Sequence, residues 1–217
     1  LTGGSDSLDL GMMTLLVEQM ADLHQMGVEV LLVTSGAIAS GVQVLAIDRQ
    51  REDIPSRQAL AAVGQSRLMH TYQELFARHD LIVAQALLTR TDIDDRQGYL
   101  HIRDSLLALL DMGVLPIINE NDVVAVEEIS EEAFGDNDTL SALVANLVDA
   151  DLLVMLGEVK GLFTADPHLD SDARLIPSVE RLGEDMDSVA GPALDDHARG
   201  GMATKLEAAR LATAPGG

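Results

Sequence analysis

The sequence predicts an α/β protein in which helices cover both faces of a mostly parallel β-sheet, as a three-layer αβα sandwich. Three observations lead to this fold class. Short, nearly all-apolar segments, typical of strands buried on both faces, alternate with amphipathic segments of helical period. Apolar residues make up 47% of the 217 residues, enough for a sizeable core. The chain has no cysteine, so neither disulfides nor zinc thiolates are expected to hold the fold together.

The first half of the chain predicts three helices and two strands. The first helix ends near Gly27, and its apolar face consists of Met12, Leu15, Leu16, Met20 and Leu23. Residues 28–33 read as a buried strand, after which a helix begins at Ser35-Gly36. A long helix follows, whose apolar face consists of Leu60, Val63, Leu68, Tyr72, Leu75 and Phe76. Residues 81–88 then form the second strand.

The second half continues the alternation. A helix with apolar residues Ile102, Leu106, Leu109 and Leu110 closes at Gly113, and residues 114–118 form a third strand. A helix over about 138–148 precedes a fourth strand at 152–156, and a last helix covers about 202–212. No repeat, low-complexity tract or linker interrupts this pattern, so we expect one domain over residues 1–217.

The charge balance excludes two classes of partner. The chain has 36 acidic and 14 basic residues, which give a formal net charge of −22 at pH 7. Phosphate backbones and anionic bilayers repel such a chain, so we expect no nucleic-acid binding and no membrane binding. No apolar run reaches the roughly 18 residues of a membrane span, and no basic leader is present. A soluble, cytoplasmic globular protein is the expectation.

Polar residues follow every predicted strand. They occupy residues 34–36, 89–92, 119–122 and 157–158. Ligands of open α/β sheets bind at the carboxyl ends of the strands, so these residues predict a binding site there. The alternative is that the same residue types cap helices and form turns.

The glycine motifs exclude several common sites. Gly36 and Gly41 have the first spacing of a phosphate-binding P-loop, but Val42 and Gln43 stand where that loop needs Lys and Ser or Thr. Neither a Gly-x-Gly-x-x-Gly nor a serine nucleophile elbow follows a strand. Ser35-Gly36 still places backbone N–H groups at a helix start, which suits an anion.

A second glycine segment points to a phosphoryl group more directly. Paired glycines at 200–201 precede a helix that carries Lys205 in its first turn. A helix N-terminus and an ammonium together suit a phosphoryl group. The alternative is a glycine loop with a chance surface lysine, but Lys160 is the only other lysine in the chain.

The acidic and amide clusters do not predict a protein-held metal. Residues 135–138 (GDND) suit the N-cap of a helix, and Asn119, Asn121 and Asp122 suit a turn. Neither cluster has a neighbouring His or Cys, and the spacing is not that of an EF-hand.

Read together, these segments resemble the amino acid kinase family. Six stretches occur in the family's order and span nearly the whole chain: residues 33–39 (VTSGAIA), 61–67 (AAVGQSR), 118–122 (INEND), 135–138 (GDND), 160–167 (KGLFTADP) and 200–205 (GGMATK). The resemblance is closest to the branch that phosphorylates glutamate. Sister branches typically carry three glycines where this chain has residues 34–36.

The resemblance implies an ATP-dependent phosphotransferase with a carboxyl group as acceptor. It implies conversion of L-glutamate to L-glutamyl 5-phosphate, the first step of proline biosynthesis. Its implied cofactors are ATP and Mg²⁺, the metal being held mainly by the nucleotide phosphates. Feedback inhibition by proline and a homodimer or homotetramer are further implications of the resemblance.

The resemblance also assigns roles to residues at matching positions. Ser35, Asp122 and Asn137 correspond to glutamate contacts, with Asn119 nearby. Gly36 is expected to offer its N–H to the transferring phosphoryl group. Asp138 is expected to organise the catalytic lysines, and Lys205 to neutralise the charge that develops as the phosphoryl group moves. The nucleotide is expected beside Gly157, Glu158, Arg199, Gly200, Gly201, Met202, Ala203, Thr204 and Lys205.

The sequence departs from the family at three places. The family begins with a strand that carries Lys-x-Gly-x-Ser, and it continues past residue 217, often into a PUA domain. We therefore expect a kinase domain incomplete at both ends, without the terminal strands and without a PUA domain. The third departure is Gly157-Glu158, which stands where Thr-Asp is expected beside the nucleotide.

Two other functions remain open from the sequence. The absent upstream lysine favours a non-catalytic sensor of amino acids or nucleotides on the same fold, whereas Lys205, Asp138 and the glycine segment favour catalysis. A kinase for another small carboxylate is the second alternative.

Overall fold

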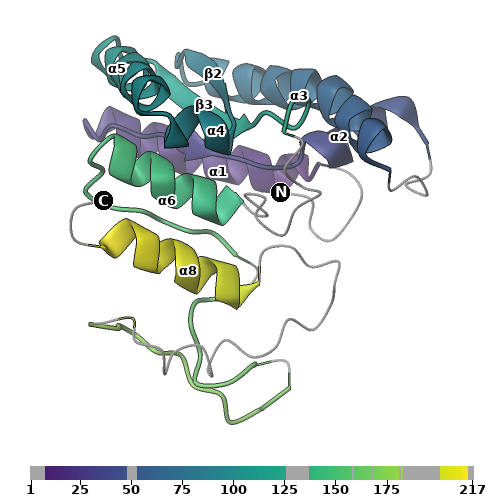
Figure 1. Ribbon diagram of the computed structural model, residues 1–217. Coiled ribbons are helices and arrows are strands. Elements are labelled where there is room, and N and C mark those ends of the chain that lie inside the picture. The colour runs from purple at the N-terminus through teal and green to yellow at the C-terminus, as the bar shows by residue number, and fades with distance from the viewer. Residues whose placement is uncertain are drawn as a thin grey trace. The chain divides into compact units, whose positions relative to one another are not determined.

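The fold is described from a computed structural model (Figure 1). The structure describes residues 8–47, 53–125, 137–157, 159–167, 169–180, 182 and 201–214. The chain divides into two compact units, Leu1–Ile129 and Ser130–Gly217. Each unit is described separately below.

A three-stranded parallel sheet forms the centre of the first unit. Its strands are β1 (Leu32–Val33), β2 (Val83–Leu88) and β3 (Leu115–Glu120), in the order β1-β3-β2. Ile117 of β3 pairs with Leu32 on one side and with Gln85 on the other. The predicted α/β class with a parallel sheet is confirmed.

Five helices are described in the first unit: α1 (Leu10–Gln25), α2 (Ala37–Leu45), α3 (Ile54–Ala77), α4 (Arg90–Asp94) and α5 (Arg96–Asp111). Short acidic side chains fix several of their starts. The carboxylates of Asp9, Asp53 and Asp95 accept hydrogen bonds from backbone N–H groups three residues onward. Thr89 and Asp92 form a reciprocal capping box at the start of α4.

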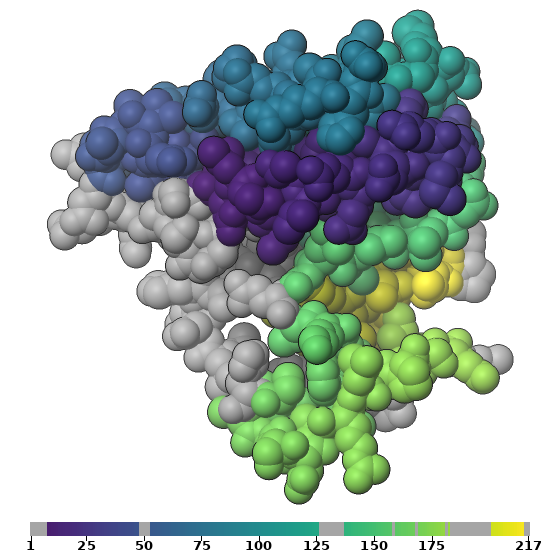
Figure 2. All heavy atoms as spheres, turned by 180° about the vertical axis from the view of Figure 1, so that it is seen from behind, coloured from purple at the N-terminus to yellow at the C-terminus, as the bar shows by residue number. Residues whose placement is uncertain are grey.

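The main core of this unit lies between α1, α3 and the sheet. Met13 and Val17 of α1 pack in one buried cluster with side chains of α3 and β3, among them Leu68, Tyr72, Phe76, Leu115 and Ile117. Helix α1 also carries the exposed apolar side chains of Leu10, Met12 and Leu15. Figure 2 shows this helix (purple) at the surface.

Helices α2 and α3 approach each other at backbone distance. A Cβ atom added to Gly64 of α3 would lie 1.7 Å from the carbonyl oxygen of Ala37, in the first turn of α2. A Cβ added to Gly41 of α2 would lie 2.0 Å from the carbonyl oxygen of Leu60. Only glycine fits at these two positions while the helices keep this separation.

In the second unit the described helices are α6 (Asn137–Leu147) and α8 (Met202–Thr213). Their buried residues include Leu140, Leu147 and Leu206. The Asn146 side-chain amide donates to the carbonyl oxygen of Leu211 at 3.0 Å, which ties the ends of the two helices together. Phe163 and Leu175 form an isolated antiparallel bridge.

The strand predicted at residues 152–156 is wrong: the structure assigns no strand there. Leu152, Val154 and Leu156 are 76%, 65% and 64% exposed. A strand exists only through its ladder partners. Among the described residues of Ser130–Gly217 the bridge between Phe163 and Leu175 is the only β pairing, so this segment pairs with no strand of its own unit there.

The first strand is shorter than the predicted 28–33. In the observed register Val30 would face Leu115, where β3 begins, so residues 28 and 29 lie beyond the end of β3. The N–H of Val28 instead bonds to the carbonyl oxygen of Leu23 and helps to end α1. No helix in the parts of the chain that the structure describes is long and apolar enough to cross a membrane.

Candidate functional site

Four of the predicted site residues lie where strands of the first unit end. Ser35 and Gly36 follow β1, Asn119 is the second-to-last residue of β3, and Asp122 comes two residues after that strand. Because β1 and β3 are parallel neighbours, their carboxyl ends share one edge of the sheet. The sequence therefore identified a polar edge correctly in this unit.

Hydrogen bonds of Thr34 stabilise the turn between β1 and α2. The N–H of Thr34 donates to the carbonyl oxygen of Ile118, and its hydroxyl lies 2.9 Å from the hydroxyl of Tyr72 on α3. Both hydroxyl-bearing residues are buried, and burial raises the pKa of Tyr72 to about 12, although the hydrogen bond with Thr34 opposes this rise.

Gly36 adopts a left-handed conformation, with φ of 102°, as the N-cap of α2. A side chain is strained in this conformation, and its Cβ would also lie 3.2 Å from Leu8. The adjacent Ser35 side chain is exposed. This backbone conformation thus presents a hydroxyl and a helix N-terminus at the polar edge, an arrangement that suits an anion.

Asn119 has its side chain fixed on both sides. Its amide Nδ2 donates to Oε1 of Gln65 at 2.8 Å, and its Oδ1 accepts from the N–H of Glu120 at 2.9 Å. The Nε2 of Gln65 is buried and has no hydrogen-bond partner. Sequence reasoning assigned no role to Gln65. Its membership of the matched stretch 61–67 was the one available signal.

A small cavity of about 10 Å³ adjoins Asp122. Its other lining residues are Ile38 from α2, Ala125, and three residues from the start of α3: Ile54, Arg57 and Gln58. The lining therefore includes one acidic and one basic residue from separate parts of the same unit. Sequence reasoning did not single out Arg57.

In the second unit Lys205 forms an ion pair with Asp138. The Lys205 Nζ lies 2.8 Å from Oδ2 and 2.9 Å from Oδ1 of Asp138, and the two side chains are 18% and 12% exposed. The Thr204 hydroxyl also donates to Asp138 Oδ2, at 3.2 Å. The first turns of α6 and α8 supply these three residues, so the packing of the two helices positions the pair.

Two further predicted residues of this unit are Gly157, which lies next to Lys205, and Asn137, which has a buried polar atom without a partner. A Cβ atom added to Gly157 would be 3.1 Å from Cε of Lys205, so the absence of a side chain at 157 leaves room for the lysine. The Oδ1 of Asn137 is buried and has no hydrogen-bond partner, which leaves an acceptor for a ligand donor.

The remaining nucleotide-side predictions divide into two groups. Glu158, Arg199 and Gly200 lie outside the described residues. Gly201 is the N-cap of α8, and Met202 and Ala203 begin that helix. Among the described residues no group of three or more His, Cys, Asp or Glu side chains could hold a metal ion.

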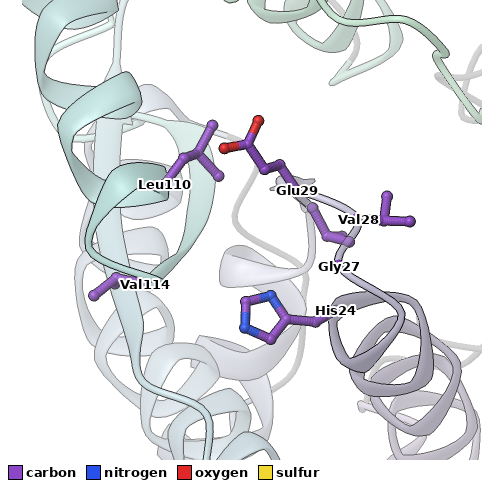
Figure 3. A pocket seen from close by; sticks show the side chains of 7 residues that line it. His24, Gly27, Val28, Glu29, Leu110 and Val114 are labelled. Carbon is purple, nitrogen blue, oxygen red and sulfur yellow. The ribbon is translucent and has the colours of Figure 1, made fainter.

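Another cavity of the first unit involves none of the predicted residues (Figure 3). It measures about 110 Å³ and lies beside the connections that precede β1 and β3, so it belongs to the amino ends of these strands. Its lining includes His24, Glu29, Leu110 and Val114. Figure 3 shows Glu29 reaching toward Leu110 of α5.

Comparisons with known proteins agree with the resemblance. The model of the amino acid kinase family matches residues 2–217. The chain is 53% identical over 216 residues to the glutamate 5-kinase of Dehalococcoides mccartyi and 52% identical to that of Herpetosiphon aurantiacus. The corresponding value for Moorella thermoacetica is 50%. These alignments cover 100% of this chain and 56% to 58% of the relatives, so the chain spans less than three fifths of their length.

Proposed function

Because this chain belongs to the amino acid kinase family, we propose that its protein transfers the γ-phosphoryl group of ATP to the side-chain carboxylate of L-glutamate. The product is L-glutamyl 5-phosphate, the first intermediate of proline biosynthesis. The observation that carries the proposal is the alignment of the whole chain with glutamate 5-kinases. The paired Lys205 and Asp138 support it chemically.

The proposed architecture is a three-layer αβα sandwich. Strand β3 supports this, since Leu115, Pro116, Ile117 and Ile118 are all almost completely buried. Successive side chains of a strand point to opposite faces of the sheet, so both faces at β3 are covered.

The first unit is proposed to bind glutamate. The Asp122 carboxylate would pair with the substrate ammonium, and the exposed hydroxyl of Ser35 would donate a hydrogen bond. The side chain of Asn119 is already oriented by Gln65, so it would act from a fixed position. In the second unit, described by itself, the family resemblance assigns Asn137 as a glutamate contact, and its unpartnered buried Oδ1 can accept a hydrogen bond.

The family resemblance assigns a phosphoryl-binding residue to each unit, and each is considered within its own unit. Gly36 would offer a backbone N–H at the start of α2, and Lys205 would offer its ammonium. Asp138 holds that ammonium at a defined point and would keep it there during transfer. Gly157, Glu158, Arg199, Gly200, Gly201, Met202, Ala203 and Thr204 are the proposed nucleotide contacts.

The reaction needs no general base, because the glutamate carboxylate is ionised at neutral pH. A carboxylate oxygen forms a bond to the γ-phosphorus while the bond to the bridging β–γ oxygen breaks, and ADP leaves. Catalysis then depends on alignment and on stabilising charge on the phosphoryl oxygens. The described residues provide no cluster of metal ligands, so Mg²⁺ is proposed to enter with the nucleotide phosphates as part of the substrate.

The remaining proposals concern the whole protein and rest on the family resemblance. They are a cytoplasmic location, where ATP and glutamate are available, feedback inhibition by proline, and a homodimer or homotetramer. Light scattering of the purified protein would measure its subunit number, and a proline titration of its activity would measure the inhibition.

The activity is tested by ADP release from the full-length protein that contains this chain. L-glutamate should support turnover, whereas N-acetylglutamate, aspartate and UMP should not. ADP release with one of those three acceptors in place of glutamate would indicate another kinase of the family. Binding of glutamate or ATP without any turnover would indicate the sensor.

The role of Lys205 is tested by Lys205→Ala. Removal of one positive group from the transferring phosphoryl should lower kcat by about a hundredfold or more and should change KM for glutamate little. The matched control is Lys160→Ala, which removes the only other lysine of the chain. Unchanged kcat in Lys205→Ala would contradict the assignment.

A further inference from the structure

We propose that Gly157 is a positioning residue for Lys205: because it carries no side chain, it determines where the lysine ammonium lies. This inference rests on the proposed function, in which that ammonium meets the transferring phosphoryl group. A distance is the observation from which it starts. A Cβ atom added to Gly157 would lie 3.1 Å from Cε and 3.9 Å from Cδ of Lys205, within the same unit.

The backbone at residue 157 does not itself require glycine. A left-handed conformation, with positive φ, is the usual backbone reason for a glycine. The described glycines with positive φ are Gly27, Gly36, Gly113 and Gly161, and Gly157 is not among them. Alanine could therefore adopt the backbone conformation present there. What glycine provides at this position is space beside the lysine side chain.

The end of the lysine side chain is fixed by hydrogen bonds, so a contact on its stem affects the ammonium. The Nζ atom of Lys205 donates to both carboxylate oxygens of Asp138, at 2.8 and 2.9 Å. The Thr204 hydroxyl lies 3.2 Å from Oδ2 of the same carboxylate. Since Cε is bonded directly to Nζ, an atom that displaces Cε also moves the ammonium relative to Asp138.

A side chain at residue 157 would cause a small displacement at little cost to the fold. Carbon atoms in good van der Waals contact are about 3.5–4.0 Å apart, so a Cβ at 3.1 Å would push Cε away by several tenths of an ångström. The lysine stem is flexible and can yield. The fold should therefore persist while the ammonium is misplaced, and misplacement of a catalytic group lowers the rate steeply.

Gly157→Ala in the full-length protein tests this inference through three measurements. They are the melting temperature, the steady-state kinetics with glutamate and ATP, and the rate at which an amine-directed reagent acylates Lys205 without substrates. Peptide mass spectrometry compares the acylation of Lys205 with that of Lys160 in the same sample. The matched control for acylation is Gly201→Ala, because a Cβ there would meet no atom of the described residues within 4 Å.

Gly157→Ala should separate function from stability. Its melting temperature should stay within about 2 °C of the wild type. Acylation of Lys205 relative to Lys160 should rise roughly fivefold, the equivalent of one weakened hydrogen bond, whereas Gly201→Ala should leave this ratio unchanged. The kcat should fall by about tenfold, and KM for glutamate should change little.

A double variant tests whether residue 157 acts through the lysine. In Lys205→Ala the ammonium is absent, so adding Gly157→Ala should lower kcat no further. An equal loss in both backgrounds would show that residue 157 acts independently of Lys205, and it would overturn the inference. Wild-type acylation and wild-type kcat in Gly157→Ala would also overturn it.

Two further outcomes separate this inference from other failures. A melting temperature lowered by several degrees in Gly157→Ala would assign the glycine a structural role and overturn the inference. If the wild-type protein does not turn over glutamate, the proposed function fails. In that case the acylation ratio of Gly157→Ala still shows whether residue 157 determines the position of Lys205.

Discussion

At the scale of single residues, Tyr72 shows how a buried group outside the predicted site can hold a site residue in place. Its hydroxyl meets that of Thr34, directly before Ser35 and Gly36. Both residues are almost completely buried, so this hydrogen bond is shielded from bulk water. Loss of the hydroxyl should therefore act on the stability of the turn and on the pH dependence of the whole unit.

The prediction for Tyr72→Phe concerns alkaline pH. Tyr72 titrates near 10.0 in the unfolded chain and near 12 in the folded one. Between these values unfolding releases a proton, so the free energy of unfolding of the wild type should fall by about 1.4 kcal/mol per pH unit. Below pH 10 this contribution is fully present.

Urea unfolding of both proteins between pH 8 and 11.5 measures this effect. The phenylalanine variant should be less stable by about 1 kcal/mol at pH 8, because it lacks the hydrogen bond. Its disadvantage should shrink above pH 10, where the wild type alone loses stability through this group. A constant difference across the range would refute the prediction.

The sequence revealed those candidate site residues that stand out by residue type or by position in a motif. It did not reveal contacts between residues that are far apart in the chain. Lys205 stood out because lysine is rare in this chain, and Asp138 because it occupies a matched position. Gln65 and Asn119 are 54 residues apart, and Tyr72 and Thr34 are 38 apart. Such contacts arise only when α3 packs on the sheet, and no local pattern records them.

At the scale of elements, the tightest contact is between α2 and α3. Gly64→Ala would place a methyl group against the Ala37 carbonyl oxygen, and neither backbone can move alone. We expect this variant to lose about 3 kcal/mol or more of unfolding free energy, a large value for overpacking.

The matched control is Gly11→Ala. Gly11 also lies inside a helix, and the atom nearest to an added Cβ is the side-chain Oδ1 of Asp9, at 3.3 Å. The effect of alanine there should be small, because the gain in helix propensity, up to about 1 kcal/mol, is offset by a close contact with the carboxylate that caps α1. Thermal unfolding of both variants compares the two sites. Equal Tm values would show that α2 and α3 can separate without cost.

Helix ends with strong local signals were predicted well, and the strands predicted at 81–88 and 114–118 are observed as β2 and β3, which pair with each other. Helix α1 ends where Gly27 allows it, with φ of 84°, and α5 ends likewise before Gly113. By contrast, residues 152–156 have the composition of a strand but no partner among the described residues. The hydrophobic pattern of a segment indicates whether it is buried and how long it is, whereas a strand also requires a neighbouring strand to pair with.

At the scale of the whole molecule, repulsion between like charges opposes the compact state. A formal net charge of −22 on 217 residues makes compaction costly at low ionic strength. Salt screens this repulsion, because the Debye length falls from about 30 Å at 0.01 M to about 3 Å at 1 M.

The corresponding prediction is a rise in stability with salt. Between 0.01 M and 0.5 M NaCl, Tm should increase by about 4 °C, equivalent to roughly 1 kcal/mol for a protein of this size. Calorimetric scans in NaCl and in sucrose of equal osmolality separate charge screening from exclusion of solute. A flat or falling Tm in NaCl would contradict the prediction.

The scarcity of lysine has a consequence for chemical labelling. Amine-directed reagents modify accessible side-chain amines, of which this sequence provides two. The ammonium of Lys205 is held by both oxygens of Asp138 and is largely shielded. In the folded chain an acylating reagent should therefore react mainly with Lys160 among the side-chain amines. A side-chain label attached in this way should be located mostly at that one residue.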